Sequence, residues 1–361
     1  MTDDILLYVK GKIYGGWKEA TVTRNLDAIA GKFDLVSMDK WETQAQRWTI
    51  FPGDECKIVI NGQTLITGYV DKAGPNYDAQ AHGIKILGRD KTADLVDCSA
   101  IVPGSELNGL TLQGIAAAIA KPFGIKVNAQ VDGGPKFPSF AIQPAETAWE
   151  AIERAARQRF MVVTTDGLGA LVIADIGKTR ANDALMEGQN IKAASAEYDY
   201  SQRFSQYIVK GQAAASGDGW EPATVAVESK ATDPNVKRYR PKIIMAEVQA
   251  SDGSATNRAQ LEAASRAGKS TKITVTVQGW TQSNGELWPL NSMVRIRSPL
   301  LSIDQELLIS ETKFIVSSQN GITTELQLTR PDAYLLGQAK VKKDKKDAKT
   351  GIGPDPWDTF Q

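Results

Sequence analysis

Two separate stretches of this chain consist of short runs in which apolar and polar residues alternate, with turn signals between the runs. In the first stretch, residues 5–90, Ile5, Leu7 and Val9 fall on one face at a period of two, the spacing of a strand with one buried face. Asn61-Gly62 lies between two such runs and is the strongest short signal for a β-hairpin. At least six short strands joined by turns favour a barrel or a sandwich.

The second stretch, residues 190–335, combines further strands with one helix. The helix is expected over residues 257–269. Four strands are expected after it, at residues 272–280, 293–298, 307–316 and 323–329. We interpret this pattern as a barrel closed by a helix, and none of its side chains forms a recognisable catalytic arrangement.

Residues 91–180 differ, because helical spacing replaces the alternation. Residues 112–120 predict a short helix with Thr111 as its N-cap, and residues 145–159 predict a second helix with Pro144 at its start. The fold class that follows is α+β and β-rich, with two β-barrel domains and a small inserted α/β domain. The expected parts are a first barrel domain at 1–92, the α/β domain at 93–185, a second barrel domain at 186–336 and a flexible tail at 337–361.

The tail is unlike the rest of the chain. Residues 340–349 hold six lysines and two aspartates, and such a run cannot bury enough apolar surface to become ordered. Trp357 and Phe360 follow it. One interpretation is a solvated tail; the other is a peptide that places Trp357 and Phe360 in a pocket of a partner, because aromatic side chains are favoured binding anchors.

The charge balance excludes a strong global field. The 42 Lys and Arg residues equal the 42 Asp and Glu residues, so nothing in the total favours nucleic acid or an anionic membrane as a partner. No apolar stretch approaches the roughly 18 residues of a membrane span, so no membrane insertion is expected. The N-terminus, Met1-Thr2-Asp3-Asp4, is acidic where a signal peptide would be basic. We expect synthesis in a cytoplasm without secretion by the general route.

The chain has the residue types of an enzyme but not their arrangements. His82 is its one histidine, and no Gly-x-Ser-x-Gly segment, P-loop or dinucleotide-binding glycine motif is present. Cys56 and Cys98 are expected to be small buried residues and to form neither a disulfide framework nor a zinc site. Asp94 and Asp97 form the densest acidic cluster, for which salt bridges are the simpler interpretation. We therefore expect no enzymatic activity, no cofactor and no metal.

Several segments resemble, in chain order, the baseplate central hub proteins of the phage Mu type. The segments are residues 68–71, 88–100, 143–157, 285–291, 307–309 and 326–331. The resemblance covers about residues 5–335, and the lysine-rich tail matches least well. It implies that the two barrels are tail-tube-like, and that the protein is a structural part of the virion tail baseplate, assembled in the host cytoplasm.

The resemblance also implies a mechanism and a set of partners. Three copies would form a homotrimeric ring whose six barrels imitate the six-fold symmetry of the tail tube. The ring would join the tail tube, or a tube-adaptor protein, to the trimeric tail spike protein, contact other baseplate proteins, and let DNA pass without specific binding. A closed three-fold ring needs unlike surfaces in contact, and strand addition from one barrel to the next is a plausible joint.

Two other functions stay open at this point. One is a tail-associated module that degrades the cell wall or binds carbohydrate, for which only the cluster at Asp94 and Asp97 speaks. The other is the base of a type VI secretion spike. Chains of that class usually continue into a long spike domain, which favours the phage hub.

Overall fold

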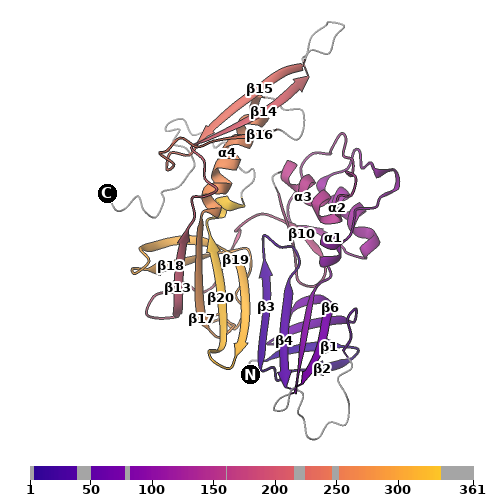
Figure 1. The fold of residues 1–361 in the computed structure, drawn as a ribbon, viewed down its shortest axis with the longest axis vertical. Coiled ribbons are helices and arrows are strands. Elements are labelled where there is room, and N and C mark those ends of the chain that lie inside the picture. The colour runs from indigo at the N-terminus through magenta and orange to yellow at the C-terminus, as the bar shows by residue number, and fades with distance from the viewer. Residues whose placement is uncertain are drawn as a thin grey trace.

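The structure is a computed structural model, and its described residues fall into six ranges. These are residues 4–38, 50–77, 82–159, 161–214, 224–245 and 252–334. The chain is β-rich, as the sequence predicts (Figure 1). No helix in these ranges has the length and apolar character needed to cross a membrane.

One 14-stranded sheet runs through both β-rich stretches. Its N-terminal half has the strand order β3-β4-β7-β6-β5-β1-β2. The strands are β1 (Ile5–Val9), β2 (Lys12–Tyr14), β3 (Glu19–Asn25), β4 (Lys32–Met38), β5 (Glu55–Ile60), β6 (Gln63–Tyr77) and β7 (His82–Asp90). Alternate residues of these strands, such as Leu7, Val22 and Leu35, meet in one hydrophobic core. The sheet therefore folds over its own apolar face, because a two-residue period puts every second side chain on that face.

The C-terminal half repeats this design around a second core. Its strands are β11 (Thr179–Arg180), β12 (Leu185–Met186), β13 (Ile191–Tyr198), β17 (Thr271–Gln278), β18 (Ser292–Ser298), β19 (Ile303–Ser317) and β20 (Gly321–Thr329). Val275, Ile296 and Leu326 belong to the core between them. No pairing among the described strands joins β2 to β3 or β13 to β18, so closure of either half into a barrel stays a prediction.

The small α/β domain packs around a third core. Its elements are α1 (Ala93–Asp97), η1 (Pro103–Ser105), α2 (Leu112–Ala120), η2 (Lys121–Phe123), β8 (Val127–Ala129), α3 (Ala148–Gln158), β9 (Val162–Thr165) and β10 (Leu171–Ala174). The prediction for α2 is confirmed, and the Thr111 side chain accepts a hydrogen bond from the Gly114 N–H. The start of α3 was predicted three residues too early, because Thr147 and Glu150 form a capping box that begins the helix at Ala148.

A separate three-stranded sheet projects from the second β-rich half (Figure 1). It consists of β14 (Gln206–Ala214), β15 (Thr224–Thr232) and β16 (Pro241–Met245), and α4 (Asp252–Lys269) packs against it. The sequence predicted one continuous barrel domain over 186–336, and the structure divides that region further. The helix predicted at 257–269 begins earlier, at Asp252. Ala255 and Ala259 are both buried, so the four-residue spacing of its apolar stripe starts before residue 257.

Candidate functional site

The two halves of the large sheet are joined by the pairing of β3 with β19, whose residues are nearly 300 positions apart. Six residues of each strand lie opposite one another, from Glu311 with Asn25 to Val316 with Ala20. The Asn25 amide donates a hydrogen bond to the Glu311 carboxylate at 2.5 Å. Phe314 is buried opposite the buried Val22. One chain therefore contains one strand-addition joint between its two modules, the kind of joint that the sequence analysis anticipated.

The two modules on either side of this joint have the same order of strand pairing. In the first, β4 pairs with β7 and β7 with β6; in the second, β17 pairs with β20 and β20 with β19. β6 and β19 are each 15 residues long. Each has one irregularity in its pairing with the next strand, between Val70 and Lys72 in β6 and between Ile309 and Glu311 in β19. The shared position of the bulge indicates that the two modules have the same design and do not resemble each other by chance, because β-bulges are specific features of a fold.

The residue-by-residue pairings of the two modules correspond as well. One row across the first module consists of Val70, Gly88, Phe33 and Val22. The matching row in the second consists of Ile309, Leu328, Ile273 and Ala196. The next row beyond the irregularity in the first module consists of Lys72, Leu87, Asp34 and Thr21. The matching row in the second module consists of Glu311, Gln327, Thr274 and Ser195. A four-strand unit is thus present twice in one sheet, in the same register.

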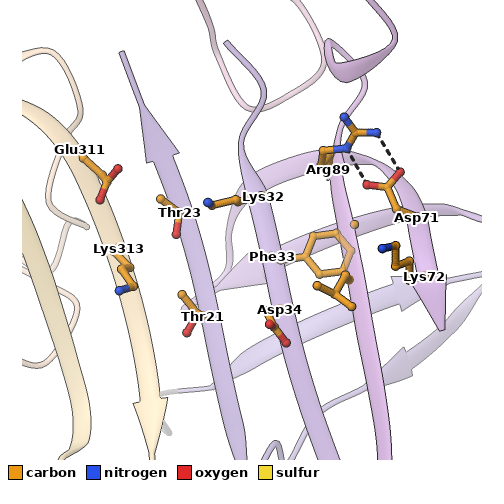
Figure 2. A pocket seen from close by; sticks show the side chains of 12 residues that line it. Thr21, Thr23, Lys32, Phe33, Asp34, Asp71, Lys72, Arg89, Glu311 and Lys313 are labelled. Atoms are coloured by element: carbon orange, nitrogen blue, oxygen red, sulfur yellow. Dashed lines mark hydrogen bonds and ion pairs between the residues drawn. The ribbon is translucent and has the colours of Figure 1, made fainter. Parts of the chain in front are cut away.

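A shallow concavity of about 500 Å³ lies on the sheet face across the joint (Figure 2). Figure 2 shows Thr21 and Thr23 of β3 between the charged side chains of β19 and β4. These charged side chains are Glu311, Lys313, Lys32 and Asp34. The face is polar because alternate residues of the same strands point to the opposite side of the sheet, where they form the two hydrophobic cores.

Cations and anions are interspersed over this face, and several of them are paired. Lys85 lies 2.8 Å from Asp34, and Arg89 lies 2.6 Å from Asp71. Lys313 of β19 lies 3.4 Å from a Glu325 oxygen of the neighbouring β20. Exposed pairs of this kind add little to stability, but they leave the face without a strong field of one sign.

The acidic cluster at Asp94 and Asp97 forms part of an arginine-centred network. Arg89 Nη2 donates to Asp97 at 2.7 Å while its Nε donates to Asp71. The hydrogen bond from Arg89 lowers the pKa of Asp97, whereas burial raises the pKa of Asp94. The salt-bridge interpretation fits this geometry. His82 begins strand β7, and its side chain lies outside the described side chains.

The two cysteines differ from each other. Cys56 is buried as expected, and burial raises its thiol pKa to about 12. The expectation for Cys98 was wrong, since it is exposed at the end of α1. Where the structure describes the chain, no three His, Cys, Asp or Glu side chains are grouped so as to hold a metal ion.

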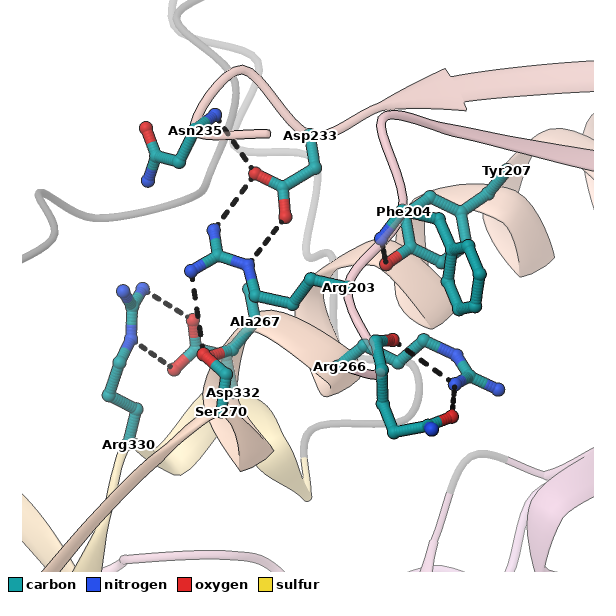
Figure 3. Close-up of polar contacts among 11 residues, drawn as sticks. Arg203, Phe204, Tyr207, Asp233, Asn235, Arg266, Ala267, Ser270, Arg330 and Asp332 are labelled. Carbon is teal, nitrogen blue, oxygen red and sulfur yellow. Dashed lines mark hydrogen bonds and ion pairs between the residues drawn. The ribbon is translucent and has the colours of Figure 1, made fainter. Parts of the chain in front are cut away.

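A second polar cluster lies at the base of the projecting sheet (Figure 3). Arg203 donates from Nε and Nη2 to the two carboxylate oxygens of Asp233, at 2.8 and 2.9 Å, and from Nη1 to Ser270 Oγ at 3.4 Å. The side chains of the ion pair are 3% and 0% exposed. Since Arg203 precedes β14, Asp233 follows β15 and Ser270 follows α4, the pair ties the projecting sheet to the start of β17. Sequence reasoning missed this cluster, as 30 residues separate the two partners and no motif marks them.

Trp357 and Phe360, the predicted partner-binding residues, lie outside the described residues. The described chain ends at Tyr334, whose hydroxyl donates a hydrogen bond to the Asp27 carboxylate at 2.7 Å. The last described residue therefore lies beside the turn that follows β3.

Four family descriptions match successive parts of the chain. Residues 4–90 match "Mu phage baseplate assembly protein GpP-like, N-terminal", and residues 92–175 match "Baseplate hub protein gp44-like, second domain". Residues 203–261 match "Tail protein NMB1110-like, third domain", and residues 251–337 match "Mu phage baseplate assembly protein GpP, fourth domain".

The chain is also similar to whole proteins of phage tails. It is 34% identical to baseplate hub protein gp44 of Escherichia phage Mu over 359 residues, covering 97% of this chain and 93% of that protein. The 43 kDa tail protein of prophage MuSo2 from Shewanella oneidensis has a solved structure with 38% identity and a TM-score of 0.84, covering 92% of this chain and all of that one. A tail protein from Neisseria meningitidis MC58 has the same fold, with 23% identity, a TM-score of 0.79 and coverage of 92% and 98%.

Proposed function

The chain belongs to the family of phage Mu-type baseplate hub proteins, and from this premise we propose that three copies form a pseudo-six-fold ring in the tail baseplate. The family is structural, and this chain is a structural protein rather than an enzyme. The ring joins the tail tube, or a tube adaptor, to the trimeric spike and leaves a channel through which DNA passes. Assembly takes place in the host cytoplasm before the virion is complete.

The observation that carries this proposal is the register-matched repeat on the two sides of the β3–β19 joint. Two equivalent modules in each of three chains would give the ring six similar positions. A six-fold tube can then be met by the same kind of surface six times. The 1–92 and 186–336 segments, less the projecting sheet, supply these two tube-like domains, and the 93–185 segment supplies the inserted domain.

The mixed charge of this sheet face supports the proposal that the face lines the channel. Duplex DNA carries a dense row of phosphates, and a wall lined with lysine and arginine would hold them by releasing counterions. The described face instead mixes both signs, as in Lys32 beside Asp34 and Lys313 beside Glu325. A wall of this composition lets the phosphates pass without a strong binding site.

The ring is tested by imaging and mass. Multi-angle light scattering of the purified protein at increasing concentration is expected to approach three times the mass of one chain, and negative-stain images of that fraction are expected to show a ring with a central hole. Particles without a hole, or a protein that remains a monomer both alone and with its tube and spike partners, would count against the proposal.

The tail is proposed to hold the spike or a neighbouring baseplate protein through Trp357 and Phe360. Replacing both residues by alanine is expected to lower capture of the spike protein in a pull-down by at least about ten-fold, because truncation of even one aromatic anchor often costs about 2 kcal/mol, and about 1.4 kcal/mol corresponds to ten-fold in affinity. Thr359→Ala is the matched control and is expected to leave capture unchanged. Equal capture by all three proteins would refute the role of the tail.

A further inference from the structure

We propose that residues 351–361 of this chain dock on a cation-rich cluster at the base of its own projecting sheet. The cluster consists of Phe204, Arg240, Lys242 and Arg266, and we call it the Phe204 cluster. The contact is made within one chain, so it needs neither the ring nor a partner and goes beyond the capture role proposed for the tail. A partner that binds the same segment would have to displace it from this cluster.

Three cations surround the Phe204 ring. The guanidinium carbon of Arg240 lies 5.1 Å from the ring centroid, and Lys242 Nζ and the Arg266 guanidinium carbon each lie 5.5 Å from it. Arg240 immediately precedes β16, Lys242 lies in it, and Arg266 belongs to the last turn of α4. Figure 3 shows Phe204 and Arg266 next to the buried Arg203. Because like charges repel over a Debye length of about 10 Å at 0.1 M salt, this arrangement favours an anionic ligand.

The positive charge of the Phe204 cluster is only partly neutralised. Arg266 Nε lies 2.7 Å from a Glu262 carboxylate oxygen. Arg240 instead donates to the Ser201 carbonyl oxygen at 2.7 Å, and Lys242 is exposed. Among the described residues, no carboxylate lies at ion-pair distance from Arg240 or Lys242. Two cations of the cluster can therefore accept carboxylates from a ligand.

The loop before β16 extends this surface. Residues 237–242 have the sequence Lys-Arg-Tyr-Arg-Pro-Lys, and the Tyr239 side chain is 81% exposed. Cations attract carboxylates by charge and aromatic rings by the cation–π interaction. A surface that combines cations with exposed aromatic rings thus suits a peptide that contains both carboxylates and aromatic side chains.

The end of the chain has this composition. Residues 351–361 include Asp355, Trp357, Asp358 and Phe360 but no lysine or arginine. The two carboxylates match the two cations that lack one, and the indole of tryptophan is the aromatic ring that cations bind best. The lysine-rich residues 340–349 have the wrong sign for this surface. Docking is therefore assigned to the segment that follows them.

The segment can reach the Phe204 cluster from the last described residue. Ser265 Oγ of α4 donates to the Ala333 carbonyl oxygen at 2.9 Å, and Lys269 Nζ lies 5.7 Å from the centroid of the Tyr334 ring. Arg266 lies between these two contacts on the same helix. Residues 335–354 connect Tyr334 to the acidic segment, and an extended chain spans up to about 3.3 Å per residue. The tether is thus long enough to return to a cluster that lies close to its origin.

Nucleic acid is the other anionic ligand to consider, and it fits the cluster less well. Proteins that hold duplex DNA through its backbone contact roughly six to ten phosphates along a row. The Phe204 cluster is compact, because its three cations surround one ring. A short acidic peptide suits such a site better than a long charged backbone.

Carbodiimide coupling, which joins a carboxylate to a lysine amine in contact with it, tests the contact in the full chain. Mass spectrometry of the monomer is expected to find Asp355 or Asp358 coupled to Lys242 at least about ten times as often as to Lys230, an exposed lysine of β15 in the same sheet. Equal coupling to both lysines would overturn the proposal. Coupling to Lys242 found only in covalent dimers or trimers would assign the segment to a neighbouring copy and overturn the contact within one chain.

A competition measurement provides the second test. A fluorescent peptide of residues 351–361 is expected to bind the full-length Asp355→Asn, Trp357→Ala, Asp358→Asn variant at least about ten-fold more tightly than the wild type, whose tethered segment holds the site at a millimolar effective concentration. In that variant, Lys242→Glu is expected to weaken binding by roughly five-fold and Lys242→Arg to leave it unchanged. Equal peptide binding by wild type and variant would contradict docking. Duplex DNA that binds in a Lys242-dependent way where the peptide does not would assign the cluster to nucleic acid and overturn the proposal. These outcomes are independent of the trimer measurements, so they leave the ring untouched.

Discussion

Asp233→Ala is expected to lower the free energy of unfolding by about 3–5 kcal/mol, because it removes the carboxylate that pairs with the buried Arg203 guanidinium. The Asp233 carboxylate accepts two hydrogen bonds from the arginine and a third from the Asn235 N–H at 3.1 Å. Urea denaturation followed by circular dichroism measures the change. Because the pair lies at the base of the projecting sheet, proteolysis between β14 and β16 is also expected to become faster.

Two controls separate the buried pair from ion pairing in general. Asp304→Ala removes the partner of Arg295, a pair at 2.6 Å whose side chains are about half exposed, and should cost at most about 1 kcal/mol. Replacing Arg203 by Met and Asp233 by Leu together should recover most of the loss, because an apolar pair needs no counter-charge. A loss of under 1 kcal/mol for Asp233→Ala would show that water reaches the arginine and that the cluster is not sealed.

Gly68→Ala is expected to destabilise the first module by about 3 kcal/mol or more, close to the upper limit for an overpacked site. A Cβ atom at residue 68 would lie 1.9 Å from the Arg89 carbonyl oxygen, and backbone cannot move aside as a flexible side chain can. Gly68 lies where β6 pairs with β5 and β7 at once, opposite Cys56 and Asp90. Widening this crossing would disturb both pairings of β6 at once.

Gly74→Ala in the same strand is the matched control. A Cβ atom there meets no other atom within 4 Å, so its effect is expected to stay within about 0.5 kcal/mol. Thermal unfolding monitored by circular dichroism, compared between the two variants, provides the measurement. If Gly68→Ala melted at the wild-type temperature, the tight crossing of β6 and β7 would not exist in solution.

Local features of the chain could be predicted where the signal is local. Thr111 and the spacing after it define α2 in full, since capping and apolar periodicity act over a few residues. The start of α3 was misplaced because Pro144 is a weaker signal than the reciprocal Thr147 and Glu150 contacts. The early start of α4 was missed because alanine contributes little to a hydrophobic pattern even where it is buried, as Ala255 is.

The sequence could predict the type of candidate site but not the residues that form it. The resemblance in segments such as 88–100 and 143–157 led to the family, and the two β-rich stretches led to the idea of two modules. The charged face could not be found, because Lys313 and Thr23 share it only through a pairing between distant strands. The buried pair of Arg203 and Asp233 was invisible for the same reason.

The sequence by itself determined the β-rich class, the separate modules and the absence of recognisable catalytic motifs, because alternation, turns and motifs depend only on residues that are close together in the chain. Only the tertiary structure decided that β3 pairs with β19 and that β14 to β16 form a sheet separate from the main one. A strand edge consists of backbone N–H and C=O groups that every residue carries, so which edge meets which partner has no signature in the sequence.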